Sequence, residues 1–207
     1  MKKEKLILGV VIFILGLIGV ISTLSMKLTL PDEIHQELSK QFTNTEIRLL
    51  TLINPTILLI GACIAGTLLY EKAGFKLPVF RRIIARQKID NLPSLTSYGI
   101  IGGILAASSI IGLELIFFNY LPTDFIELSK NFKPSIASRI LYGGITEEII
   151  VRFGVMSLFT WLLLKLFRQR KRIAIILSII LSSLLFGLGH FPVAFQAVES
   201  PGPILLG

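Results

Sequence analysis

The chain has 207 residues, of which 53% are apolar and only 16% are charged, whereas globular domains average roughly 45 to 50% apolar and roughly 25% charged residues. Together with a mean hydropathy of +0.77, this composition argues against a water-soluble domain. The apolar residues gather in stretches of about twenty, separated by short charged segments, which is typical of a chain that crosses a bilayer repeatedly. The one cysteine, Cys63, excludes an internal disulfide.

Five apolar stretches are long enough to span a membrane, and helices are expected because hydrocarbon cannot satisfy an open backbone. We therefore predict an all-α fold, a polytopic transmembrane helical bundle. The predicted spans lie near Leu6–Leu24, Leu49–Tyr70, Tyr98–Asn119, Ile136–Leu164 and Ile173–Phe191. We interpret the first span as a retained anchor rather than a signal peptide, because no small-x-small cleavage site follows it cleanly.

The net charge of +8 is explained mainly by membrane topology. Three Lys or Arg residues precede the first span, six lie in the loop 71–97 and five in the loop 165–172, while the alternate loops hold three and two. Because basic loops remain in the cytoplasm, we expect an integral protein of the cell (plasma) membrane with a cytoplasmic N-terminus. The lipid bilayer is the expected partner, and nucleic acid is not, because no zinc-finger spacing or phosphate-binding glycine loop occurs.

Ionisable residues inside the spans are costly and by default mark function. Glu114 and Arg139 are expected at similar depths on neighbouring antiparallel spans, so we interpret them as a structural ion pair. The run Gly-Gly-Ile-Thr-Glu-Glu-Ile-Ile-Val-Arg at 143–152 is different, because it places two adjacent acids and one guanidinium in the middle of a span.

The helical spacing divides the two acids of this run. At about 100° per residue, Glu148 and Arg152 share a face and can form an ion pair along the helix. Glu147 points about 100° away and must find a partner on another helix or bind a proton, a water or a metal. A second interhelical tie is the alternative. We also expect Gly143 and Gly144 to let a neighbouring helix approach closely.

The fifth span places Phe186 and His190 on one face at four-residue spacing. A histidine at a helix end is either an interfacial anchor or a site residue. An acid on one helix and an imidazole on another can together hold and deprotonate a water, directly or through a metal. With a rise of about 1.5 Å per residue, Glu147 lies roughly 16 Å below the end of its span, whereas His190 is close to its own, so they meet only if a span extends, tilts or is offset.

These residues carry a resemblance to a known family. Glu147-Glu148-x-x-x-Arg152 followed by Phe-Gly, and then Phe186-x-x-x-His190 on the next span, resemble the first two motifs of the CPBP intramembrane metalloproteases. This family groups type II CAAX prenyl endopeptidases with bacteriocin-processing, Abi-like and bacteriocin-immunity proteins. The resemblance divides the chain into residues 1–97, with anchor spans and a basic cytoplasmic loop, and residues 98–207, a CAAX-protease-like membrane core.

The resemblance implies an intramembrane endopeptidase that hydrolyses a peptide bond of a membrane-associated or lipidated protein or peptide. Glu147 would be the base that activates water, His190 would hold that water or a metal, and Arg152 would orient the pair Glu147 and Glu148. Phe186 would pack the wall of the site. Zinc is a possible cofactor of the family, bound by Glu147 and His190, and a metal-free glutamate mechanism is the alternative, because one Glu and one His are few ligands for a catalytic zinc.

The family pattern has a third motif, a His followed four residues later by Asn or Asp, and no histidine follows His190 in this sequence. The final residues resemble the start of a further apolar segment, so we expect a C-terminally truncated sequence with impaired activity. Two alternatives to an enzyme stay open. One is a non-catalytic bacteriocin self-immunity or peptide-binding protein on the same scaffold, and the other is a transporter subunit whose acids relay ions.

Overall fold

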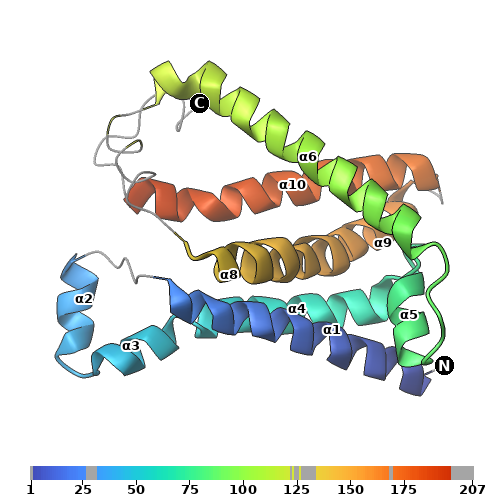
Figure 1. Ribbon diagram of the computed structural model, residues 1–207, viewed down its shortest axis with the longest axis horizontal. Helices are drawn as coiled ribbons and strands as arrows, with labels where there is room; N and C mark the ends of the chain where they lie inside the picture. The colour runs from blue at the N-terminus through green and yellow to red at the C-terminus, as the bar shows by residue number, and fades with distance from the viewer. Residues whose placement is uncertain are drawn as a thin grey trace. The chain divides into compact units, whose positions relative to one another are not determined.

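The computed structural model describes residues 2–26, 32–121, 123, 126, 134–167 and 170–196, and these residues form helices and no strand (Figure 1). Within them, five helical stretches are long and apolar enough to cross a membrane: Lys3–Ser25, Asn44–Leu69, Leu92–Tyr120, Ile136–Leu166 and Lys171–Phe191. The predicted all-α bundle with five spans is confirmed. The chain is an integral membrane protein. The starts of the second and third spans, Asn44 instead of Leu49 and Leu92 instead of Tyr98, move by more than one helical turn.

The chain forms two compact units. One comprises residues 1–77 and 133–191, and the other comprises residues 78–132 and 192–207. Within the first unit, the first two spans pack on the fourth. The division of the chain predicted between residues 97 and 98 stays a prediction.

The first unit carries most of the helices. In chain order they are α1 (Lys2–Ser22), the short 3-10 helix η1 (Thr23–Ser25), α2 (Asp32–Ser39), α3 (Asn44–Leu50), α4 (Ile53–Leu69), α8 (Ile136–Ser138), the π-helical segments η3 (Arg139–Thr146) and η4 (Ile149–Val155), α9 (Met156–Leu166) and residues 171–191 of α10 (Lys171–Gln196). Helix α3 begins at a capping box, in which the Thr43 hydroxyl accepts from the Glu46 N–H and the Glu46 carboxylate accepts from the Thr43 N–H.

Helices α1 and α4 lie side by side (Figure 1), and the continuous helix from α8 to α9 packs on both. Small residues permit these contacts, as in other membrane bundles. A Cβ placed on Gly154 would lie 2.5 Å from the Ala62 Cβ of α4, and one placed on Gly66 would lie 2.5 Å from the Phe153 ring. The glycines therefore bring α4 against the helix that carries the acidic pair.

A glycine turn after α4 and a lysine of α10 join these two helices at one end of the unit. Gly74 has φ +78°, and the Phe75 N–H bonds to the Tyr70 carbonyl at 2.8 Å, which is the hydrogen bond of a Schellman motif. The Lys171 ammonium lies 3.5 Å from the Gly74 carbonyl oxygen. Further along α10, the Thr160 hydroxyl of α9 donates to Ser178 Oγ at 2.7 Å. These contacts hold the first half of α10 against the bundle.

The second unit contains α5 (Pro78–Ile84), α6 (Leu92–Phe117) and the short 3-10 helix η2 (Phe118–Tyr120). Arg82 of α5 forms an ion pair with Asp90 at 2.7 Å, and Pro93 stands in the first turn of α6, where its missing N–H costs nothing. The described residues of α6 include none that is buried. Since Glu114 lies on α6 and Arg139 in the first unit, their predicted ion pair stays a prediction; the Arg139 Nε donates to the Pro134 carbonyl at 3.1 Å.

Candidate active site

The acidic pair lies between two π-helical segments. Glu147 and Glu148 separate η3 from η4, and the Glu147 N–H bonds to the carbonyl of Tyr142, five residues earlier. The predicted spacing of 100° per residue is therefore wrong for this stretch, which is wound more widely than an α-helix. Such segments are rare and frequently occur at functional sites.

Thr146 fixes the position of this helix in the bundle. Its side chain is fully buried, and its hydroxyl donates to the carbonyl of Gly16 on α1 at 2.8 Å. A Cβ on Gly19 would overlap the Thr146 hydroxyl and the Leu141 carbonyl. The close approach predicted for Gly143 and Gly144 is thus wrong, because Cβ atoms on these residues would meet only atoms of their own helix, at 3.8 Å. The glycine that permits the close approach is Gly19 of α1.

Replacing Gly19 with alanine is expected to destabilise the bundle, because α1 must move away from Thr146. Overpacking of this kind costs about 1 to 3 kcal/mol. The matched control is Gly61→Ala on α4, where a Cβ would meet nothing within 4 Å, and which should stay within about 1 kcal/mol of the wild-type free energy of unfolding. Unfolding in detergent measures both, and equal stability of the two variants would contradict this packing.

The ion pair predicted along the helix is present. The Arg152 Nε lies 2.6 Å from the Glu148 carboxylate, and the two side chains are 72% and 49% exposed. The pair is therefore open to the surroundings of the first unit rather than enclosed by its helices. The Arg152 guanidinium therefore pairs with the Glu148 carboxylate within one helix, as the four-residue spacing predicted.

Glu147 is placed differently. Its side chain is half-buried, and it forms no hydrogen bond or ion pair with the part of the chain that the structure describes. Its carboxylate leans back along the helix, since an added Cβ on Gly143 would lie 3.8 Å from Glu147 Oε2. Glu148 follows Glu147 directly in the chain, and Tyr142 stands one π-helical turn before it.

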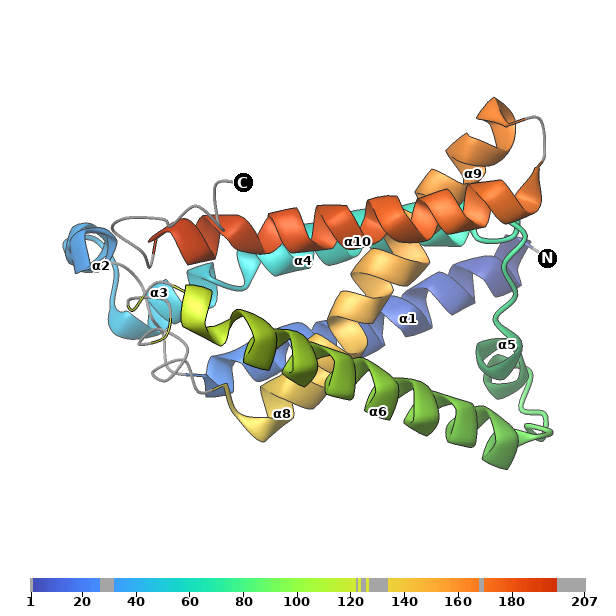
Figure 2. The same cartoon turned by 90° about the horizontal axis from the view of Figure 1, so that it is seen from above.

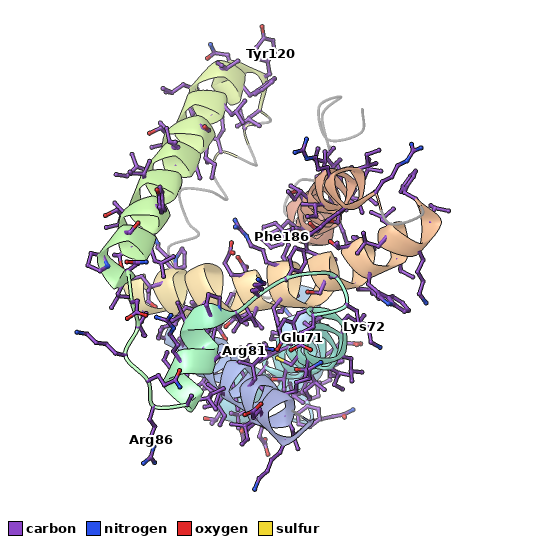
Figure 3. All side chains as sticks on the ribbon, turned by 90° about the vertical axis from the view of Figure 1, so that its right-hand side faces the viewer. Glu71, Lys72, Arg81, Arg86, Tyr120 and Phe186 are labelled. Carbon is purple, nitrogen blue, oxygen red and sulfur yellow. The ribbon has the colours of Figure 1, made fainter. Side chains whose placement is uncertain are left out.

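His190 presents one ring nitrogen to its surroundings. Its Nδ1 lies 2.8 Å from the Phe186 carbonyl, and because a carbonyl can only accept, Nδ1–H is the donor and Nε2 is left with its lone pair in the neutral ring. The Phe186 and His190 rings meet edge to face, with centroids 4.5 Å apart and planes at 67°. Figure 3 shows Phe186 on the side of α10 nearest the helix of Glu147. The Phe186 ring and the Phe186 carbonyl together orient the His190 imidazole.

Two features of the helices bear on the difference in depth predicted between Glu147 and His190. Helix α10 continues to Gln196, so His190 lies roughly 9 Å from its end instead of at the end. The helix of Glu147 also crosses α10 obliquely (Figure 2). Of the alternatives left open by the sequence, the oblique crossing is the one observed.

Tyr142 is a residue of this region that sequence analysis missed. In an α-helix, positions five apart lie on different faces, so α-helical periodicity separates Tyr142 from Glu147. The backbone bond between these two residues closes the wider turn and stacks one above the other. The Gly-Gly pair that follows Tyr142 is the sequence feature that indicates an unusual backbone conformation. The sequence-based interpretation attributed this pair to helix packing instead.

A zinc centre does not fit the donor atoms of the described residues. No three His, Cys, Asp or Glu side chains gather anywhere in residues 2–26, 32–121, 134–167 and 170–196, whereas a catalytic zinc takes about three protein ligands. Glu147 and His190 supply two, and Glu148 is occupied by Arg152. The chemistry available from these groups is therefore that of a carboxylate and an imidazole acting on water.

Comparison with protein families supports the same interpretation. Residues 129–206 match the family model described as type II CAAX prenyl endopeptidase Rce1-like. The resemblance to the CAAX prenyl endopeptidases is confirmed. The Rce1-like match includes both motifs, from Glu147 to His190, and leaves out α1 to α6. No curated relative and no solved structure matches the chain significantly.

The Rce1-like match has a coarse functional meaning. The model describes a family of CAAX-type proteases, a likeness that supports an enzyme by resemblance. The membrane spans fit a substrate located at the bilayer. The roles predicted for Glu147, Glu148, Arg152, Phe186 and His190 stay predictions.

Proposed function

We propose that the chain is an intramembrane endopeptidase that hydrolyses a peptide bond of a membrane-associated or lipidated protein or peptide, using a water activated by Glu147. The observation that carries the proposal is that the Glu147 carboxylate, half-buried within its span, forms no hydrogen bond or ion pair with the described residues. Glu147 and His190 come from two helices and belong to the two motifs within the Rce1-like match.

The two side chains offer complementary acceptors for one water. The Glu147 carboxylate accepts one hydrogen bond from it, and Nε2 of His190 accepts the other, since Nδ1 is bonded to the Phe186 carbonyl. A water that donates both hydrogens directs an oxygen lone pair away from these groups and toward a substrate carbonyl. This arrangement is general base catalysis with an oriented nucleophile.

Glu147 removes a proton from the water while the water oxygen bonds to the carbonyl carbon, and the carbonyl π electrons move to its oxygen. When the C=O bond reforms, the C–N bond breaks, and the proton held by Glu147 passes to the leaving amine. Arg152 keeps Glu148 ion-paired, so that only Glu147 is available as the base, and Phe186 holds the imidazole ring.

Hydrolysis in water labelled with heavy oxygen tests this function. We expect the full-length protein in liposomes to cleave a prenylated peptide and to place the label in the new carboxylate of the product. Peptide binding without cleavage would instead support the immunity or peptide-binding alternative. Ion flux across the liposome membrane without cleavage would support a transporter subunit.

We also propose that the N-terminus faces the cytoplasm of a plasma-membrane protein. The support is the concentration of Lys and Arg before the first span and in the loops 71–97 and 165–172.

A further inference from the structure

The position of Glu147 depends on its backbone rather than on a partner of its side chain. The half-buried carboxylate forms no hydrogen bond or ion pair with the described residues. A general base needs to be held within about 0.5 Å of its productive position, because a displacement of about 1 Å can reduce the rate about 100-fold. Within the described part of the chain, the constraint on Glu147 therefore comes from the backbone that carries it.

That backbone contains a wide helical turn. The Glu147 N–H bonds to the carbonyl of Tyr142, five residues earlier, whereas an α-helical bond would reach back only four residues. An α-helical turn in its place would hold one residue fewer and would rotate Glu147 about the helix axis by about 100°, the angle of one α-helical residue. A contact that favours the wide turn therefore controls the direction of the Glu147 side chain.

Thr146, the residue before Glu147, makes such a contact with α1. Its hydroxyl lies 2.8 Å from the Gly16 carbonyl oxygen and 3.2 Å from the Leu141 carbonyl oxygen. Gly16 belongs to α1, and Leu141 stands five residues before Thr146, which is the spacing of the wide turn. Because the Thr146 side chain is fully buried, solvent does not compete for its hydroxyl hydrogen. This hydroxyl therefore ties the wide turn to the first span.

We propose that Thr146 is a positioning residue for Glu147, and that the first span supports the site through this hydrogen bond. The inference rests on the proposed function of Glu147 as the base. Helix α1 lies outside residues 129–206 of the Rce1-like match, so the match gives it no part in the site. Gly19 permits the contact, since a Cβ there would overlap the Thr146 hydroxyl. Thr146 transfers no proton and acts only through the backbone of Glu147.

Thr146→Val tests the inference, because valine is close in shape to threonine and lacks the hydroxyl. In the folded full-length protein with a prenylated peptide, we expect kcat to fall about 10-fold to 100-fold. KM should change by no more than about twofold, since the base is displaced and not the substrate. Thr146→Ser keeps the hydroxyl and should restore kcat to within about threefold of the wild-type value.

The matched control is Thr160→Val in α9. Thr160 is also fully buried, and its hydroxyl donates to Ser178 Oγ at 2.7 Å, so this variant also removes a buried hydrogen bond of the bundle. It should keep the wild-type kcat. Equal losses of kcat in the two valine variants would overturn the inference, because they would reflect weakened packing in general. An equal loss in Thr146→Ser and Thr146→Val would also overturn it, because the hydroxyl would not be the group that matters.

Gly19→Ala reaches the same contact from α1 and tests the inference even if Thr146→Val does not fold. In the folded fraction, kcat should fall about 10-fold or more, whereas Gly61→Ala on α4, with no neighbour within 4 Å of its Cβ, should keep the wild-type kcat. Wild-type kcat in folded Gly19→Ala would contradict the inference. An inactive Glu147→Gln together with an unaffected Thr146→Val would leave the proposed function standing without Thr146, whereas full activity of Glu147→Gln would refute the proposed function itself.

Discussion

Replacing Glu147 with glutamine is expected to reduce kcat by about 1,000-fold to 10,000-fold, which is the upper range of a general base contribution. The amide has nearly the same shape as the carboxylate but cannot take a proton from water. Because Glu147 has no hydrogen bond or ion pair to the described residues, the substitution breaks no contact of the fold. Single-turnover cleavage of a prenylated peptide by purified full-length protein measures the loss.

The matched control for this change is Glu114→Gln on α6. It removes a carboxylate from another predicted span and should leave the cleavage rate of the folded protein unchanged. Equal losses in the two variants would indicate that removing any acid from the membrane impairs the protein. Wild-type cleavage by Glu147→Gln would show that another group activates the water.

Replacing His190 with alanine is expected to reduce kcat by about 100-fold to 1,000-fold. The substitution removes the proposed second acceptor for the water and the ring that packs on Phe186. His190 and the Phe186 carbonyl that it contacts lie in the last turns of α10. Since Phe186 is exposed there, we expect the substitution to leave the fold little changed. The matched control is His35→Ala in α2, which removes the other histidine of the sequence.

The fold could be predicted from the sequence because a bilayer imposes strict rules. Spans of about twenty apolar residues must be helical, so their number and approximate ends follow from composition alone. How the spans pack could not be predicted in the same way. The contact between Gly19 and Thr146 joins residues far apart in the chain, and glycine is common in all membrane helices.

The site was predictable where its contacts are local. The pair Glu148 and Arg152 needs only four-residue spacing on one helix, and it is present. The position of Tyr142 depends on a π-helical turn, which α-helical periodicity cannot represent. The relative positions of Glu147 and His190 depend on how their two helices cross. The motifs named these residues, but only the structure relates them in space.

The central claim is that Glu147 and His190 act on one water as a unit. The most direct test is to measure single-turnover cleavage in the wild type, in Glu147→Gln, in His190→Ala and in the double variant. Residues that act as a unit show strongly non-additive losses, so the double variant should cleave within about threefold of the rate of Glu147→Gln alone. Losses that multiply in the double variant would contradict the claim, because they would show that the two residues act independently.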